Sequence, residues 1–478
     1  MMNDDKELAN EIIRNLEVHE GGKKSKIEKP VFDSDLSYRI TGEDVPKRAL
    51  KNWLHSYLAV TQNQESPDIF HFWCGMSAIA AAMNRRVWFD QGFYKTYPNL
   101  YVLLIAKSAE CAKSTAVRWA DQIISSVPNL VIMRDKMTPE GLLSKLSVQI
   151  SEEALAYEGK VKKEGCAYII ARELRVLFSQ VSYISGLTET LCDLYDCPDT
   201  HPYTTRHNPI EIHNACINIL GASTPEWLAN GLPSHDKSGG FLGRFIFAVA
   251  DKPKRKIAWP EMSDKAIALR EALMYDLQHI AKLRGPVTAT EEAKSLYEDW
   301  YMDFKIPEDP RMTEYYGRKK TTILKIASIL SISSSNDMIV KPIHIKTALK
   351  VLDNVEHDMT DAFTFLGATA ESILCRQILS LLQQRGVMSR VNLLRSISYK
   401  LRTYKDLDNA ISMLLQEEKI TRELANTGKD EDKNDDGSPK QLYRLTTAEE
   451  RRQSAARRAK KAKILEYVFD KDGEWLGD

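Results

Sequence analysis

The stretch that most constrains the fold is Tyr97–Val117, YPNLYVLLIAKSAECAKSTAV. Within it, Leu100–Ala106 is a short apolar run bounded by Pro and Asn, which is typical of a strand buried on both faces. Lys107–Ala112 has the composition of a loop, and Lys113 opens a helix. A strand, a loop and a helix in this order predict one unit of a parallel α/β sheet.

The loop and the helix start also have the order of a phosphate-binding loop. A helix N-terminus offers unpaired N–H groups and partial positive charge, and Lys113 adds a full charge. In the standard pattern G-x-x-x-x-G-K-[ST], Lys107 and Ala112 occupy the two glycine positions. Because glycine reaches positive φ without a Cβ penalty, the sequence predicts a different loop backbone or weaker phosphate binding. A capped core helix without a ligand is the alternative. The predicted phosphate contacts are Ser108, Ala109, Ala112, Lys113, Ser114 and Thr115.

Composition limits the class of protein. The chain has 478 residues, 43% hydrophobic and 28% charged, with a net charge of zero, so a nucleic acid would have to be bound by local basic patches. Its 7 cysteines are scattered without a C-x-x-C pair, which favours a reducing compartment without a disulfide framework or zinc site. The acidic N-terminus does not have the pattern of a signal peptide, and no apolar run approaches a membrane span. We therefore expect a cytoplasmic chain with no membrane partner.

Further along the chain, apolar runs alternate with helical patterns. This alternation predicts an α/β fold with a three-layer core around a mainly parallel sheet, of the P-loop NTPase kind. Ligands of such sheets bind at the carboxyl ends of the strands. The predicted later strands are Leu130–Met133, Ala167–Ala171, Ala215–Leu220 and Arg244–Ala250.

Polar residues follow two of these strands directly. Glu173 comes after the run YIIAR, where a strand-end acid would polarise the water that attacks a phosphate, although a helix-capping role is the alternative. Its neighbour is Arg172, at a position where an aspartate would help to hold magnesium. Thr224, after Ser223, has a hydroxyl that could sense the γ-phosphate or cap the next helix. These residues are expected to share one edge of the sheet with Lys113.

Basic residues elsewhere suggest further contacts. Arg244 follows a glycine-rich turn, and an arginine there could reach a nucleotide bound by a neighbouring subunit. Arg206 and His207 lie at a predicted hairpin tip, where they would contact a nucleic-acid backbone or form an ordinary turn. Arg318 precedes a helical run, from which it could contact the γ-phosphate or simply carry surface charge.

Composition shifts divide the chain into six predicted parts. The order helix, helix, helix, strand, loop, strand near the C-terminus is that of a winged helix, and the stretch after it is basic. The parts are a mobile segment (1–40), a helical domain (41–96), the P-loop ATPase core (97–260), a helical lid (261–370), a winged helix (371–447) and a basic tail (448–478).

Five segments in this order resemble one known family. They are YPNLYVLLIAKSAECAKST, AYIIARELRVLF, ETLCDLYDCPDTHPYTTR, LGASTPEWL and GGFLGRFIF, and they are similar to segments of the helicase-like P-loop ATPases of phages, prophages and plasmids. The chain departs from that family's A-P-S-G-x-x-x-K-S-T loop at Lys107 and Ala109. The resemblance implies an oligomeric AAA+-type or related ATPase with a finger in trans. It assigns ATP to Lys113, Mg²⁺ to Ser114, and catalytic roles to Glu173, Thr224 and Arg244.

Three functions remain open from the sequence. The first is an ATP-dependent DNA helicase or translocase of a mobile element, acting in replication as a hexameric ring on single-stranded DNA alongside other replication proteins. The second is a nucleotide-dependent DNA-binding or helicase-loading protein with little turnover. The third is a transcriptional regulator that reads DNA through its winged helix.

Overall fold

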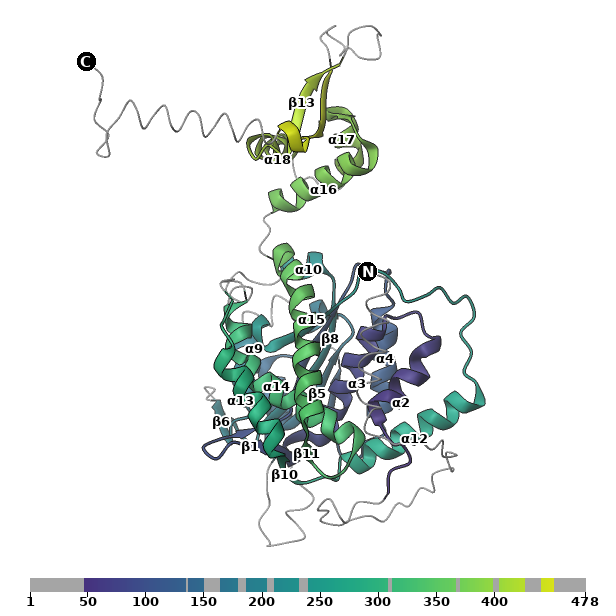
Figure 1. Cartoon of the computed structure of the whole chain (residues 1–478), viewed down its shortest axis with the longest axis vertical. Helices are drawn as coiled ribbons and strands as arrows, with labels where there is room; N and C mark the ends of the chain where they lie inside the picture. The colour runs from purple at the N-terminus through teal and green to yellow at the C-terminus, as the bar shows by residue number, and fades with distance from the viewer. Residues whose placement is uncertain are drawn as a thin grey trace, which may run out of the picture. The chain divides into compact units, whose positions relative to one another are not determined.

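A computed structural model describes residues 47–134, 136–149, 164–178, 186–203, 210–231, 240–307, 312–366, 370–398, 404–425 and 440–450. The chain divides into two compact units, one ending at Leu366 and one beginning at Gly367 (Figure 1). The sequence predicted that the C-terminal domain begins at residue 371.

The centre of the first unit is a 5-stranded sheet in the order β4-β5-β8-β3-β9. All neighbouring strands in it run parallel. Each strand overlaps one of the predicted runs, so the prediction of a parallel α/β core is confirmed. β3 carries the lysine loop at its end and lies between β8 and β9. The strands are β3 (Tyr101–Ile105), β4 (Ile132–Arg134), β5 (Cys166–Ala171), β8 (Cys216–Ser223) and β9 (Phe245–Val249).

Helices cover this sheet. α3 (Asp68–Met83) contacts β3, β8 and β9, and α4 (Lys113–Ile124) packs beside it against β8. α9 (Leu187–Tyr195) also contacts β8, while α15 (Pro342–Leu366) contacts β9 and α14 (Thr313–Ser334). Figure 1 shows α3 and α4 on one side of the strands and α9 and α14 on the other.

The predicted domains within residues 41–370 share one hydrophobic core, which differs from the expected division into a helical domain, an ATPase core and a lid. The reason is visible in α3, where every residue from Asp68 to Met83 is buried. Small residues such as Gly75 and Ala80–Ala82 alternate with large apolar side chains on this helix and let neighbouring elements approach closely, so the helix is internal.

The first unit also contains a 4-stranded sheet, β11-β10-β1-β2, that the sequence did not indicate. Its strands are too short to show a period in the sequence: β1 (Val87–Asp90), β2 (Lys95–Thr96), β10 (Gly285–Ala289) and β11 (Ile339–Val340). The predicted hairpin is present as the antiparallel pair β6 (Thr200–Tyr203) and β7 (Ile210–His213). The other helices are α2 (Trp53–Val60), α5 (Pro139–Ser147), α7 (Leu174–Leu177), α10 (Pro225–Gly231), α12 (Asp264–Ile280) and α13 (Glu291–Asp303), with 3-10 turns η1 (Thr61–Asn63), η2 (Asn84–Arg86) and η3 (Leu242–Arg244).

The second unit has its own small core of leucine, isoleucine and tyrosine side chains. Among the described residues, its three helices and two long strands follow one another in the order that the sequence predicted. A short strand, β12, adds to them and makes an antiparallel 3-stranded sheet in the order β12-β14-β13. The elements are α16 (Ala370–Arg385), β12 (Met388–Ser389), α17 (Arg390–Ile397), α18 (Tyr404–Gln416), β13 (Ile420–Leu424) and β14 (Gln441–Leu445).

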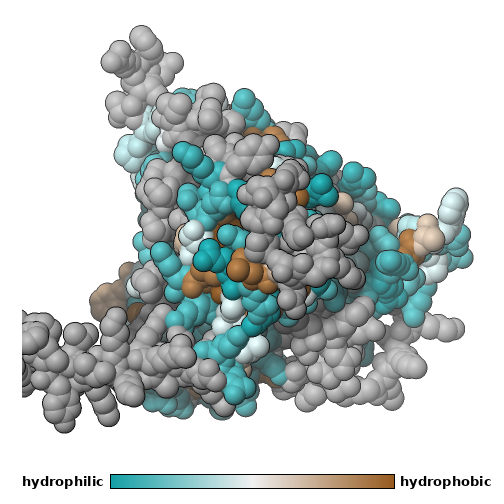
Figure 2. Space-filling view, turned by 90° about the horizontal axis from the view of Figure 1, so that it is seen from above, coloured by the Kyte–Doolittle hydropathy of each residue, from teal (hydrophilic) through white to brown (hydrophobic). Residues whose placement is uncertain are grey.

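The surface is mostly polar in the space-filling view. Figure 2 shows hydrophilic residues over most of the coloured area, with apolar residues in small patches. None of the helices in the described ranges is both long enough and apolar enough to span a bilayer.

Candidate functional site

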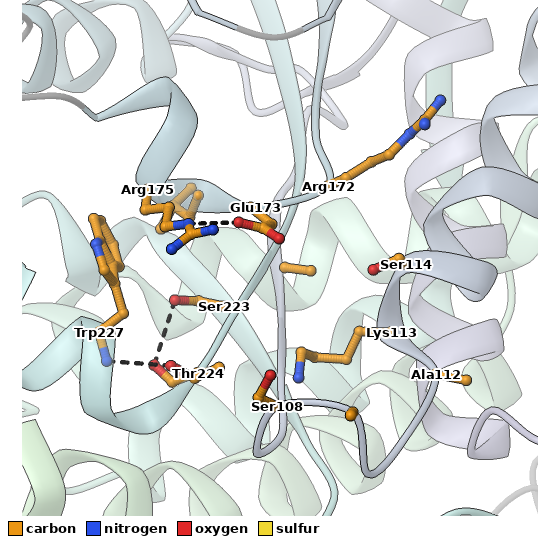
Figure 3. A pocket seen from close by; sticks show the side chains of 13 residues that line it. Ser108, Ala112, Lys113, Ser114, Arg172, Glu173, Arg175, Ser223, Thr224 and Trp227 are labelled. Carbon is orange, nitrogen blue, oxygen red and sulfur yellow. Dashed lines mark hydrogen bonds and ion pairs between the residues drawn. The ribbon is translucent and has the colours of Figure 1, made fainter. Parts of the chain in front are cut away.

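A cavity of about 350 Å³ lies where β3, β5 and β8 end (Figure 3). Since the three strands are parallel, their carboxyl ends meet at one edge, and the residues that follow them are brought together. Seven of the predicted site residues line this one cavity. They are Ser108, Ala109, Ala112, Lys113, Ser114, Glu173 and Thr224.

The loop before α4 keeps a left-handed backbone although it has no glycine. Ala109 has φ 60°, and Ala112, at the second glycine position, has φ 45° and ψ 39°. The sequence predicted either a different loop backbone or weaker phosphate binding. At Ala112 the backbone keeps the left-handed conformation that a glycine would adopt there. The conformation costs a residue with a Cβ about 1–2 kcal/mol. The hydroxyl of the fully buried Ser66 donates a hydrogen bond of 2.9 Å to the carbonyl of Ala112 and helps to hold it in place.

Lys113 folds back over this loop. Its Nζ donates to the carbonyl oxygens of Ala106 at 2.6 Å and Lys107 at 2.8 Å. Partial burial lowers the pKa of its ammonium, and nearby groups, Glu173 among them, oppose that shift. The hydroxyl of Ser114 is exposed at the first turn of α4, beside the lysine. The N-terminus of α4, the ammonium and this hydroxyl together form a site suited to a phosphate group.

Glu173 stands at the N-cap position of α7, in extended conformation, but its side chain makes no capping hydrogen bond. The capping alternative is therefore not what the structure shows. Its Oε2 instead accepts a hydrogen bond from Nε of Arg175 at 2.5 Å. The side chain of Glu173 is 53% exposed and lines the cavity.

Thr224 caps a helix and also lies at the cavity, while its predicted contact with a γ-phosphate stays a prediction. Its Oγ1 accepts a hydrogen bond of 3.2 Å from the backbone N–H of Trp227, so it caps α10. The same residue lines the cavity. Ser223 lies next to it at the end of β8, and its hydroxyl donates to the Thr224 carbonyl at 3.4 Å.

Arg244 does not line the cavity. Its side chain is 10% exposed, its Nη1 donates to the carbonyl of Gly240 at 2.5 Å, and its Nη2 lies 4.0 Å from Oδ2 of Asp196. The guanidinium also lies over the ring of Tyr195. Its predicted function concerns a neighbouring subunit, which a single chain does not test, so that role stays a prediction.

Arg318 lies in the second turn of α14, outside the cavity lining, and its Nη1 donates to the carbonyl of Glu314 at 3.1 Å. The contact with a γ-phosphate that the sequence suggested for Arg318 stays a prediction. Thr115 is exposed on α4 and likewise does not line the cavity. Arg206 and His207 fall outside the described residues.

Six further residues line the cavity without having been predicted as site residues, and three of them have a large polar or aromatic side chain: Arg172, Arg175 and Trp227. Arg172 directs its side chain away from the others in Figure 3, and its Nη2 lies 3.7 Å from Asp121 of α4. Arg175 and Trp227 stand on short helices that begin just after a strand end. The sequence contains this spacing, but no motif marks either residue.

The residues present fit a phosphate-bound divalent cation. Mg²⁺ is held by few protein oxygens together with waters and phosphate oxygens. The cavity offers the Ser114 hydroxyl and the Glu173 carboxylate on opposite sides of the space beside Lys113 (Figure 3). The magnesium role of Ser114 stays a prediction.

The chain matches no protein-family model and no curated protein. What the site does must therefore be argued from its geometry.

Proposed function

We propose that the first unit is a P-loop-type ATPase and that the chain is an ATP-dependent DNA helicase or translocase. One observation carries this proposal: the loop before α4, Lys113, Ser114, Glu173 and Thr224 come from three strand ends and line a single cavity. The cavity thus combines an anion site at Lys113 with the carboxylate of Glu173 and the hydroxyl of Thr224, which is the combination that phosphate hydrolysis needs.

Each residue then has a defined task. Lys113 and the N–H groups at the start of α4 bind the phosphates of ATP, and Ser114 would hold Mg²⁺, which when bound would neutralise charge on the phosphate oxygens. Water attacks the γ-phosphorus, and the bond to the bridging oxygen breaks, which releases ADP and phosphate. Glu173 accepts a hydrogen bond from the attacking water and orients it. Thr224 contacts the γ-phosphate.

The last catalytic group comes from a second subunit. We propose a homo-oligomeric ring, a hexamer, in which Arg244 acts on the nucleotide of the neighbouring subunit. Because its side chain is buried by contacts with Gly240 and Asp196, this role requires the arginine to leave those contacts upon assembly. Single-stranded DNA is the proposed track, and replication in the cytoplasm is the proposed setting.

The second unit has the element order of a winged helix, which we propose as its fold. In such a fold the second helix of the pair α17 and α18 would enter the major groove. The first turns of α18 carry Asp406, Asp408 and Lys405, and the guanidinium of Arg390 donates to the Asp408 carboxylate at 2.7 and 2.9 Å. A transcriptional regulator would protect one operator in a footprint, whereas a translocase would protect none.

A loading protein with little turnover is the second candidate. Two observations favour it: Ala109 and Ala112 add Cβ atoms to the phosphate loop, and Arg172 stands where an aspartate would help to hold magnesium. This candidate shares ATP binding with the first and differs from it in rate.

Steady-state ATP hydrolysis with and without single-stranded DNA separates the two. The proposed function requires a rate that DNA raises and that Glu173→Gln lowers by about 10²–10⁴ while ATP binding persists, since the amide keeps the shape and loses the charge. Tight ATP binding with a negligible rate at every DNA concentration would establish the loading protein instead.

A further inference from the structure

We propose that Arg175 is a positioning residue that orients the Glu173 carboxylate for hydrolysis. This inference rests on the proposed function, since it assigns Arg175 a role at the same site. It derives from one juxtaposition: Arg175 and Glu173 both line the cavity, and the guanidinium of the arginine donates a hydrogen bond to the carboxylate two residues before it.

The local fold explains why Arg175 lies there. β5 ends at Ala171, and α7 begins at Leu174, so the chain turns directly after the sheet edge. Leu174 and Leu177 are both 1% exposed and fix α7 against the core. With that face of the helix buried, Arg175 remains on the open side, where its side chain is 66% exposed.

The contact occupies one side of the carboxylate. Nε of Arg175 lies 2.5 Å from Oε2 of Glu173. Figure 3 shows the other carboxylate oxygen on the side that faces Ser114, where a phosphate bound by the loop would lie. The arginine thus holds one oxygen and leaves the second directed toward the position of the attacking water.

The contact adds little to the stability of the fold. An ion pair between exposed side chains contributes about 0–1 kcal/mol, and both partners here are more than half exposed. Glu173 has no capping bond that would fix its rotamer by other means. Orientation of a reacting group affects rate strongly, because a displacement of about 1 Å can cost about 10²-fold. The expected effect of Arg175 is therefore on turnover and not on folding.

The test measures kcat and KM for ATP hydrolysis, in the presence of single-stranded DNA, in the full chain. Arg175→Ala is expected to lower kcat about tenfold with KM nearly unchanged. Arg175→Lys should recover part of the loss, since an ammonium can still bond to one carboxylate oxygen. Lys294→Ala is the matched control, because Lys294 forms an exposed pair of 2.6 Å with Glu291 on α13, away from the cavity lining.

A double-variant cycle shows whether Arg175 acts through Glu173. In the Glu173→Gln background, Arg175→Ala should cause no further loss, because the group that it positions has already been altered. Additive losses, an unchanged kcat or a raised kcat in Arg175→Ala would overturn the inference. A raised KM with unchanged kcat would overturn it as well and make Arg175 a phosphate-binding residue. If the wild-type chain does not hydrolyse ATP, the proposed function fails first and the inference fails with it.

Discussion

The two edges of the parallel sheet use polar side chains in opposite ways. At the amino edge, Nη1 of Arg85 donates to the carbonyl oxygens of Cys197, Pro198 and Ala215 at 2.5, 3.0 and 2.7 Å, and its side chain is 7% exposed. At the carboxyl edge, Arg175 is 66% exposed and bonds to the one carboxylate described above. The guanidinium of Arg85 is thus bonded to three backbone carbonyls and the Asp199 carboxylate.

The difference in exposure and acceptors indicates which of the two arginines is available to a ligand. A buried guanidinium surrounded by backbone carbonyls stabilises the segments that it joins, and releasing it would leave buried acceptors unpaired. A guanidinium beside an open cavity can exchange its contacts at little cost. We therefore expect burial and the nature of the acceptor, and not the residue type, to separate structural arginines from functional ones in this chain, and the buried Arg244 tests this expectation.

The largest effect is expected for Lys113→Ala, which should abolish ATP binding. The lysine supplies charge to phosphate, and apart from the carbonyls of Ala106 and Lys107 it makes no described hydrogen bond. The fold should therefore persist. Calorimetric titration of ATP measures the affinity, and a thermal melt checks the fold. Equal affinity in the variant and the wild type would disprove the assignment of this loop.

Arg244 tests the comparison most directly, because it is as buried as a structural arginine while the proposed function gives it a role in trans. Arg244→Ala is expected to bind ATP normally and to hydrolyse it about 10³-fold more slowly. Mixing it with Glu173→Gln should restore activity, since some interfaces then combine one subunit's intact Glu173 with another's intact Arg244.

The measurement is the ATPase rate across mixing ratios at concentrations that preserve the oligomer. A maximum at intermediate ratios supports a shared site. If Arg244→Ala loses stability and mixing restores no activity, Arg244 has a structural role like that of Arg85.

Arg85→Ala should destabilise the first unit by about 3 kcal/mol. The cost comes from the buried carbonyls of Cys197 and Ala215, which lose their donor, because the ion-pair partner Asp199 is itself 90% exposed and stays solvated. Chemical denaturation measures the change, with Lys294→Ala as the surface control. A loss below about 1 kcal/mol would show that water can replace this arginine at the amino edge.

The smallest effect is expected for Ala112→Gly. Glycine relieves the left-handed strain at φ 45° but adds freedom to the unfolded chain, so the net gain in stability is about 1 kcal/mol or less. ATP affinity is expected not to fall. A clear loss of affinity would mean that the alanine Cβ is needed to hold the loop in shape, and that the departure from glycine is functional.

Local pattern was sufficient for the strands of the parallel sheet and for most of the cavity. Apolar runs of a few residues followed by a polar residue mark where a buried strand ends, and parallel strands end at one edge. For this reason the sequence alone predicted that Lys113, Glu173 and Thr224 lie at one edge of the sheet. The elements of the second unit were likewise predictable, since α16, α17 and α18 have clear helical periods.

Local pattern failed where an element is short or buried on every side. β1, β2 and β11 have 4, 2 and 2 residues, too few to show alternation, and exist because they pair with distant chain segments. α3 is buried all round, so the domain boundaries expected on either side of it do not appear.

The sequence by itself determined the order of the strands and helices, the lysine loop and the acid at a strand end. Only the tertiary structure decided that Ala112 adopts a left-handed backbone, that Arg85 and Arg244 are buried, and that Arg175 bonds to Glu173 at the cavity. The physical reason is that periodicity reports which face of an element is buried, whereas the partner of a charged side chain depends on residues from other elements that packing brings beside it.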